Sequence, residues 1–162
     1  MRFNAELAEV FLLHYNIVMS YDYKEKKIVS IIASNVEPAI ALNIMGHLGV
    51  SVGAYADKEI MGQANIKDKS GITHVGISKY PFIITKVKMG KLKQTIETAK
   101  QNPNILVIDY PREMLTTGHD DELVKAIGEK EEKDMEYLGA VLYGDSNVIN
   151  ELTGKFSLWR ID

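Results

Sequence analysis

The sequence predicts a three-layer α/β sandwich built on a mixed, mostly parallel sheet of about four strands. Apolar runs of strand length alternate along the chain with segments of helical periodicity, as in sheets whose parallel neighbours are joined by helices. The last connections between strands are shorter, which allows one antiparallel strand and therefore a mixed sheet. A chain of 162 residues with 46% apolar residues fits one domain with a buried core.

The first half of the chain divides into an extension and the start of the domain. Residues 1–26 are expected to form a helical extension, with Asn4 as its N-cap, and a polar connector; residues 27–162 form the domain. The nearly continuous apolar run at residues 27–33 predicts a central strand buried on both faces. Pro38 is suited to the first turn of a helix that ends near residue 55, and a polar segment without predicted regular structure follows.

The second half alternates between strands and helices. Strands are expected at residues 82–87, 105–108, 138–143 and 155–159, and helices at residues 91–101, 120–127 and 146–152. Asn102-Pro-Asn104 ends the first of these helices. Asp145 or Ser146 can cap the last one.

Composition restricts the compartment and the partners. The sequence contains no cysteine, which excludes disulfides and thiolate chemistry. Its first residues lack the basic start and unbroken apolar core of a signal peptide, and no apolar run is long enough to span a bilayer. We therefore expect a cytoplasmic protein without membrane association.

Charge is distributed unevenly although the formal net charge is only −3. Residues 67–93 contain seven lysines and one acid, whereas residues 113–136 contain nine acids and three lysines. One interpretation is a basic surface for an anionic ligand; the other, which we prefer, is solvated faces that happen to segregate. Nucleic acid is a possible partner but not a favoured one, because the net charge is negative.

Several segments together resemble the type II peptidyl-tRNA hydrolases from about residue 27 to residue 159. Residues 27–34 resemble the first strand of that family, and residues 82–100 its Lys-Val strand and following helix. The run Ile108-Asp-Tyr-Pro-Arg-Glu-Met-Leu-Thr-Thr-Gly118 resembles its Ile-x-Asp-Ala-Gly-x-Thr-x-Ile-x-x-Gly segment and places Asp109 on the family's aspartate. The resemblance implies a peptidyl-tRNA hydrolase type II-like fold.

The lysine-rich turn of those hydrolases, which carries a lysine taken as catalytic, is missing here. The same stretch is Asn35-Val-Glu-Pro-Ala-Ile-Ala41, with Glu37 near the lysine position. Binding a tRNA end and stabilising an oxyanion both favour positive charge. We therefore expect no appreciable peptidyl-tRNA hydrolysis.

A second resemblance is to an uncharacterised sister family, a domain of unknown function with the same fold. Its two motifs are Ala-Leu-Asn-x-x-x-His and Leu-Thr-x-x-Phe-x-Leu-Trp. Both are complete here, as Ala41-Leu-Asn-Ile-Met-Gly-His47 and Leu152-Thr-Gly-Lys-Phe-Ser-Leu-Trp159. This resemblance implies the fold and no particular activity.

The candidate site combines a helix face with the end of a strand. Asn43 and His47 are four residues apart and share one face of the predicted helix, and Asp109 ends a strand that can lie beside it. His47 could act as a general base, Asp109 as its acidic or orienting partner, and Asn43 as an amide donor. Thr116-Thr-Gly-His119 could line the same cleft, with Thr116 as a ligand-binding residue, or form a turn that caps the helix at Asp120. In the alternative interpretation, Asn43 and His47 fix the helix to a loop by buried hydrogen bonds.

These features leave two functional hypotheses. The preferred one is a small-molecule or partner-binding domain; the alternative is a hydrolase acting on a small or nucleic-acid-end substrate through His47 and Asp109. The histidines lack metal-ligand spacing, so we expect no metal site and no cofactor. Gly46, Gly49 and Gly53 suggest close packing of their helix. Trp159 suggests a self-complementary surface and hence a possible homodimer.

Overall fold

The computed structural model describes residues 21–160, so the helix expected at residues 4–19 lies outside the described residues. The main sheet has five strands, β1 Lys26–Ala33, β4 Phe82–Val87, β5 Leu106–Pro111, β6 Tyr137–Asp145 and β7 Ser157–Leu158. The α-helices are α2 Pro38–Tyr55, α3 Met89–Lys100, α4 Glu113–Thr116, α5 Asp120–Gly128 and α6 Ser146–Thr153. Two single-turn helices, η1 Lys58–Ile60 and η2 Glu132–Asp134, and a hairpin of β2 Asn65–Lys67 and β3 Thr73–Val75 complete the described chain.

The sheet is mixed, with strand order β5-β6-β1-β4-β7, and β1 at its centre as expected. The expectation of a mostly parallel sheet of about four strands needs correction. Only β1 and β4 pair in parallel, while the other three pairings are antiparallel. The reason is that β6 lies between β1 and β5. Strands β1 and β5 run in the same direction, but each is hydrogen-bonded to β6, which runs in the opposite direction.

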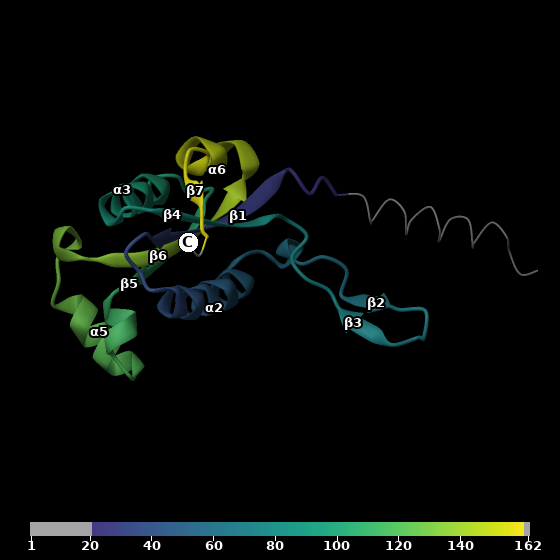
Figure 1. Ribbon diagram of the computed structural model, residues 1–162, viewed down its shortest axis with the longest axis horizontal. Helices are drawn as coiled ribbons and strands as arrows, with labels where there is room; N and C mark the ends of the chain where they lie inside the picture. The colour runs from purple at the N-terminus through teal and green to yellow at the C-terminus, as the bar shows by residue number, and fades with distance from the viewer. Residues whose placement is uncertain (1–20, 161–162) are drawn as a thin grey trace, which may run out of the picture.

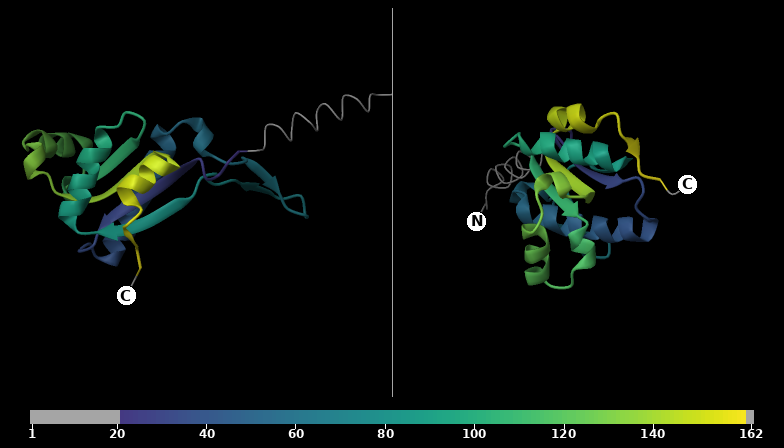
Figure 2. Two further views of the ribbon diagram at one scale, coloured as in Figure 1. Left: turned by 90° about the horizontal axis from the view of Figure 1, so that it is seen from above. Right: turned by 90° about the vertical axis from the view of Figure 1, so that its left-hand side faces the viewer.

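Helices cover both faces of this sheet, which gives three layers (Figure 1). α2 packs on one face, where Ile44 and Leu48 meet Ile28 and Val141 in one core cluster. α3 and α6 pack on the other face, in a second cluster that includes Leu92 and Ile149. The end-on view in Figure 2 shows the same arrangement, with α2 on one side of the sheet and α3 and α6 on the other. Both faces of the central strand are therefore buried, as its continuous apolar run predicts.

The glycines that permit close packing are not those expected from the sequence. A Cβ atom at Gly46, Gly49 or Gly53 would meet nothing within 4 Å outside its own chain neighbours and the backbone of its own helix. At Gly139 on β6, in contrast, a Cβ atom would lie 2.9 Å from Cγ2 of Ile44 on α2. The absence of a side chain on the sheet, and not on the helix, therefore lets α2 approach closely.

The β2–β3 hairpin was not predicted, and it extends away from the body of the sheet (Figure 1). All six of its strand residues are exposed, and Asn65 pairs with Val75 at its base. Exposed on both faces, it lacks the half-buried alternation by which a strand is recognised in sequence.

Candidate functional site

A cleft of about 360 Å³ lies between α2, the end of β5 and the loop that joins α4 to α5. Its apolar lining consists of Leu48, Ile108, Tyr110, Met114 and Leu123. Polar side chains from His47, Ser51, Thr117, His119 and Asp120 also border it, together with Gly118 and Asp109. We call this feature the His47 cleft.

His47 stands in the cleft because α2 presents one exposed face beside the edge strand β5. Its ring centroid lies 5.9 Å from that of Tyr110, with the two planes tilted by 48°. Tyr110 is only 3% exposed, and this burial raises the pKa of its hydroxyl. His47 itself is exposed and has no hydrogen-bond partner among residues 21–160. Its imidazole is therefore available to a ligand and does not fasten the helix to a loop.

Asp109 borders the same cleft, but its carboxylate does not meet His47. The carboxylate lies 2.7 Å from the ammonium of Lys100, the last residue of α3. Side chains alternate across a strand, and the neighbours Ile108 and Tyr110 pack with the cluster under α2. The side chain of Asp109 accordingly faces the α3 side of the sheet, so the structure does not form the expected dyad.

The other two predicted ligand-binding residues lie outside the cleft lining. Asn43 is exposed on α2 one turn before His47, so the shared helix face is as expected. Thr116 donates its hydroxyl to the carbonyl of Glu113 at 3.3 Å, as a residue of a local turn does. Its neighbour Thr117 borders the cleft in its place.

The far wall of the cleft is held by charged groups around α4. Lys130 binds the buried carboxylate of Glu113, and Arg112 forms a two-pronged pair with Glu136, whose Nη2–Oε1 distance is 2.6 Å. Burial is the largest single influence on Glu113 and would raise its pKa. The hydrogen bond from Lys130, a backbone hydrogen bond and the charge of Lys130 together outweigh burial and hold this pKa below its ordinary value. The hydrogen bond from Arg112 likewise lowers the pKa of Glu136. These carboxylates therefore favour the charged form and anchor the segment that leads to the loop.

A helix-capping contact fixes the loop itself. The backbone amide of Gly118 donates to the carboxylate of Glu122 at 2.9 Å, in the first turn of α5. His119 follows as the N-cap residue of α5 and faces the cleft opposite α2. The cleft thus brings together two histidines from distant parts of the sequence.

Ser51 and Tyr110 were not predicted as site residues, although the sequence contains a signal for each. Ser51 continues the spacing of four from Asn43 and His47, and strand alternation places Tyr110 on the opposite face from Asp109. Thr117, Gly118 and His119, which were expected either to line the cleft or to form a turn, do line it. Within residues 21–160, no three acidic or histidine side chains gather in an arrangement that could hold a metal ion. No helix in that range is long and apolar enough to cross a membrane.

Comparison with known proteins places the chain in a family. The model of the family described as "Protein of unknown function (DUF2000)" matches residues 26–160, so the chain belongs to that family. A solved protein of unknown function from Agrobacterium tumefaciens strain C58 has a similar fold, with a TM-score of 0.72 and 21% identity over 84% of this chain and 98% of the other. No curated protein matches the chain.

Proposed function

We propose that this DUF2000 protein is a small-molecule-binding domain and that the His47 cleft is its binding site. One observation supports this most: the exposed imidazole of His47 has no hydrogen-bond partner among the described residues, and it lines the same cleft as His119 and the ring of Tyr110. Concave sites with an apolar lining and a few convergent polar groups are the usual form of ligand pockets.

The lining suggests the chemistry of the ligand. Tyr110 and Leu48 offer an apolar floor, while two imidazoles and the hydroxyls of Ser51 and Thr117 offer donors and acceptors at the rim. A molecule with a flat apolar body and one polar head would complement both parts. We therefore propose an aromatic compound with a single polar substituent as the ligand class.

The alternative of an acid/base hydrolase has less support. A general base needs a partner within hydrogen-bond reach, and the carboxylate of Asp109 is paired with Lys100 on the α3 side. The first turn of α2 reads Pro38-Ala-Ile-Ala41 after the N-cap Glu37, so it contains no basic residue that could stabilise an oxyanion. Binding without catalysis by this dyad is the better interpretation.

The proposal is tested by following the histidine imidazole signals in NMR spectra while benzoate, benzylamine and benzamide are added in turn. At least one probe should shift the signals of both His47 and His119, because these rings border one cleft. His47→Ala should abolish that shift and change the free energy of unfolding by less than about 0.5 kcal/mol, since the side chain is exposed. His74→Ala is the control, because His74 lies on the exposed strand β3 outside the cleft and pairs with Asp68.

Two outcomes would contradict the proposal. The first is that none of the three probes shifts the two imidazoles at millimolar concentration. The second is that His47→Ala lowers thermal stability while a probe that shifts His119 still binds with unchanged affinity. The second result would assign His47 a structural role.

We further propose that the domain at residues 27–162 has the type II peptidyl-tRNA hydrolase-like fold, and that residues 1–26 are an extension that precedes it. The support is the order and spacing of the motifs from residue 27 to residue 159. A cytoplasmic location is proposed because the chain contains no cysteine, as is common in a reducing compartment. A homodimer is also proposed, because Trp159 lies near an exposed terminus of the domain.

A further inference from the structure

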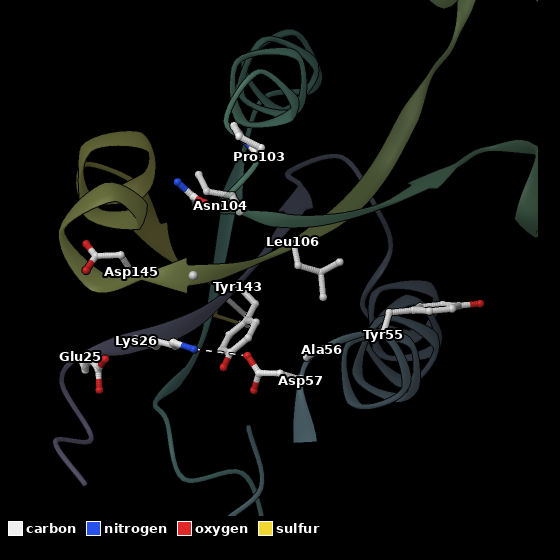
Figure 3. Close-up of a pocket in the computed structure, with 12 residues that line it drawn as sticks. Glu25, Lys26, Tyr55, Ala56, Asp57, Pro103, Asn104, Leu106, Tyr143 and Asp145 are labelled. Carbon is white, nitrogen blue, oxygen red and sulfur yellow. Dashed lines mark hydrogen bonds and ion pairs between the residues drawn. The ribbon is translucent and has the colours of Figure 1, made fainter. Parts of the chain in front are cut away.

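A second pocket, of about 470 Å³, lies on the α2 side of the sheet at the other end of β5 (Figure 3). Four separate segments form it: the start of β1, the residues that follow α2, the residues before and at the start of β5, and the end of β6. The His47 cleft borders residues 108–110 of β5, whereas this pocket borders residues 104–106. The two pockets are therefore distinct, and nothing in the proposed function uses this one.

Tyr143 is the residue that marks this pocket as a site. It is only 5% exposed, and among residues 21–160 its hydroxyl makes no hydrogen bond of ordinary geometry, although the Lys26 ammonium lies near it. Figure 3 shows the side chain pointing from β6 into the pocket, toward Lys26 and Asp57. Folded proteins rarely leave a buried hydroxyl unpaired, because such a group loses water without a replacement. Burial raises the pKa of Tyr143 to about 12, so the hydroxyl keeps its proton and can donate it to a ligand.

Lys26 and Asp57 supply the charges beside this hydroxyl. The Lys26 ammonium lies 3.3 Å from Oδ2 of Asp57 and 5.5 Å from the centroid of the Tyr143 ring. An ammonium has three protons, and the pair with Asp57 uses one of them. Asp57 in turn keeps its other oxygen, Oδ1, which no hydrogen bond or ion pair within residues 21–160 occupies. Both members of the pair therefore have capacity for a further partner.

These groups are complementary to a zwitterion. The spare protons of Lys26 and the hydroxyl of Tyr143 are donors that suit a carboxylate, and Oδ1 of Asp57 suits an ammonium. Glu25 and Asp145 add further negative charge around the pocket, which disfavours a ligand that is only an anion. Ile105 and Leu106 border the pocket as apolar residues that could accommodate an aliphatic side chain.

We propose that this second pocket binds a small α-amino acid with an aliphatic side chain. Its carboxylate would receive hydrogen bonds from Lys26 and the Tyr143 hydroxyl, and its ammonium would pair with Asp57. The ligand would thereby satisfy the hydroxyl that the protein leaves unpaired.

The test is isothermal titration of the full chain with L-leucine, N-acetyl-L-leucine and L-leucinamide. The acetylated compound lacks the ammonium and the amide lacks the carboxylate, so L-leucine should bind at least about tenfold more tightly than either. If N-acetyl-L-leucine binds as tightly as L-leucine, the proposed recognition of a zwitterion is wrong and the pocket is a site for the carboxyl end of a peptide. Equal binding of L-leucinamide would overturn it in favour of an amine site, and the absence of binding by all three at millimolar concentration would overturn the ligand class.

Variants separate a ligand contact from a structural role. Tyr143→Phe removes one oxygen, so the affinity for L-leucine should fall about tenfold while the melting temperature of the free protein stays the same or rises. Tyr80→Phe is the matched control, because Tyr80 packs on Tyr143 at a centroid distance of 6.0 Å yet does not line the pocket. His47→Ala should leave L-leucine binding unchanged, which separates this test from that of the proposed function. Unchanged affinity in Tyr143→Phe, or a fall in its melting temperature without loss of affinity, would overturn the role of the hydroxyl.

Discussion

The buried carboxylate of Glu113 is the residue on which the far wall of the His47 cleft depends. Lys130 pairs with this carboxylate directly, through a side chain that is 38% exposed, and the charge of Arg112 also attracts it. The folded state lowers the pKa of Glu113 below the ordinary value of 4.5. A lowered pKa contributes stability above the ordinary value, and this contribution is lost as the pH falls through the lower, folded-state value. The wall should therefore loosen in acid.

Lys130→Met should destabilise the protein at neutral pH by about 1–3 kcal/mol, because it leaves the Glu113 carboxylate buried without its partner. This loss is smaller than that of a fully buried pair, because the Lys130 side chain is partly exposed. The contribution of Glu113 to the pH dependence of stability should also change sign. Without Lys130, burial raises the pKa of Glu113, so protonation of this carboxylate would stabilise the fold. Chemical unfolding between neutral and acid pH measures both effects. Lys125→Met on α5 is the control, and identical stability curves for the two variants would contradict the prediction.

At the scale of elements, the position of α2 against the sheet depends on the absence of a side chain at Gly139. The contact is specific, because a Cβ atom there would also lie 3.1 Å from Cδ1 of Ile32 and 3.3 Å from the carbonyl of Ile31. Small-to-large changes in a packed core force neighbours out of their preferred rotamers. The helix that carries His47 thus owes its distance from the sheet to a residue on another element.

Gly139→Ala should lower the free energy of unfolding by about 1–3 kcal/mol and shift the NMR signals of α2. Gly46→Ala is the matched control: its Cβ would enter open space on an exposed helix face, so it should stabilise the protein by about 0.5–1 kcal/mol. Thermal unfolding of both variants decides the matter. Destabilisation by Gly46→Ala, or none by Gly139→Ala, would show that the close approach has been assigned to the wrong element.

The β2–β3 hairpin and α5 lie at opposite ends of the described structure and carry opposite charges (Figure 1). The hairpin carries Lys67 and Lys69 near the exposed side chains of Ile72 and Val75, the latter 84% exposed. α5 buries no residue, and its exposed Val124 follows three acids in its first turn. Two-stranded ribbons are marginally stable alone, and large exposed apolar patches indicate interaction sites.

The proposed homodimer would cover both of these elements at once. In a two-fold dimer, the basic hairpin of each protomer would lie against the acidic α5 of its partner. Trp159 is a weaker anchor than expected, because it packs against the core beside β4 and its amide donates to Ile84 at 2.9 Å. The proposed interface is therefore the hairpin with α5.

The protein should elute as a dimer at low ionic strength and dissociate as salt is added, because exposed charges are screened. The double variant Lys67→Glu, Lys69→Glu should be monomeric, and mixing it with Asp121→Lys, Glu122→Lys should restore a heterodimer. Lys24→Glu, Lys155→Glu is the control of equal charge change. Light scattering that gives the 18.2 kDa monomer at every concentration in low salt would exclude this interface.

Local sequence patterns were enough to predict the elements that form the core. The continuous apolar run at residues 27–33 predicted a central strand, Pro38 marked the first residue of α2, and Asp145 was one of two expected caps for α6, which it fulfils by accepting from Asn147 and Val148. Each follows from a local signal, because an apolar run, a fixed φ angle and a side-chain cap are read from neighbouring residues. The shared helix face of Asn43 and His47 followed from the same kind of reasoning.

Which elements lie side by side depends on long-range packing and could not be predicted from local patterns. The insertion of β6 between β1 and β5 made most pairings antiparallel, and the alternation of β5 directed Asp109 to Lys100 while it placed Tyr110 under His47. The burial of the Tyr143 hydroxyl without a hydrogen-bond partner among the described residues depends on the packing of β1, α2 and β6, which are distant in sequence. Strand order and the convergence of distant side chains depend on which of several apolar faces pack together, and the periodicity of a single segment contains no information about its partner.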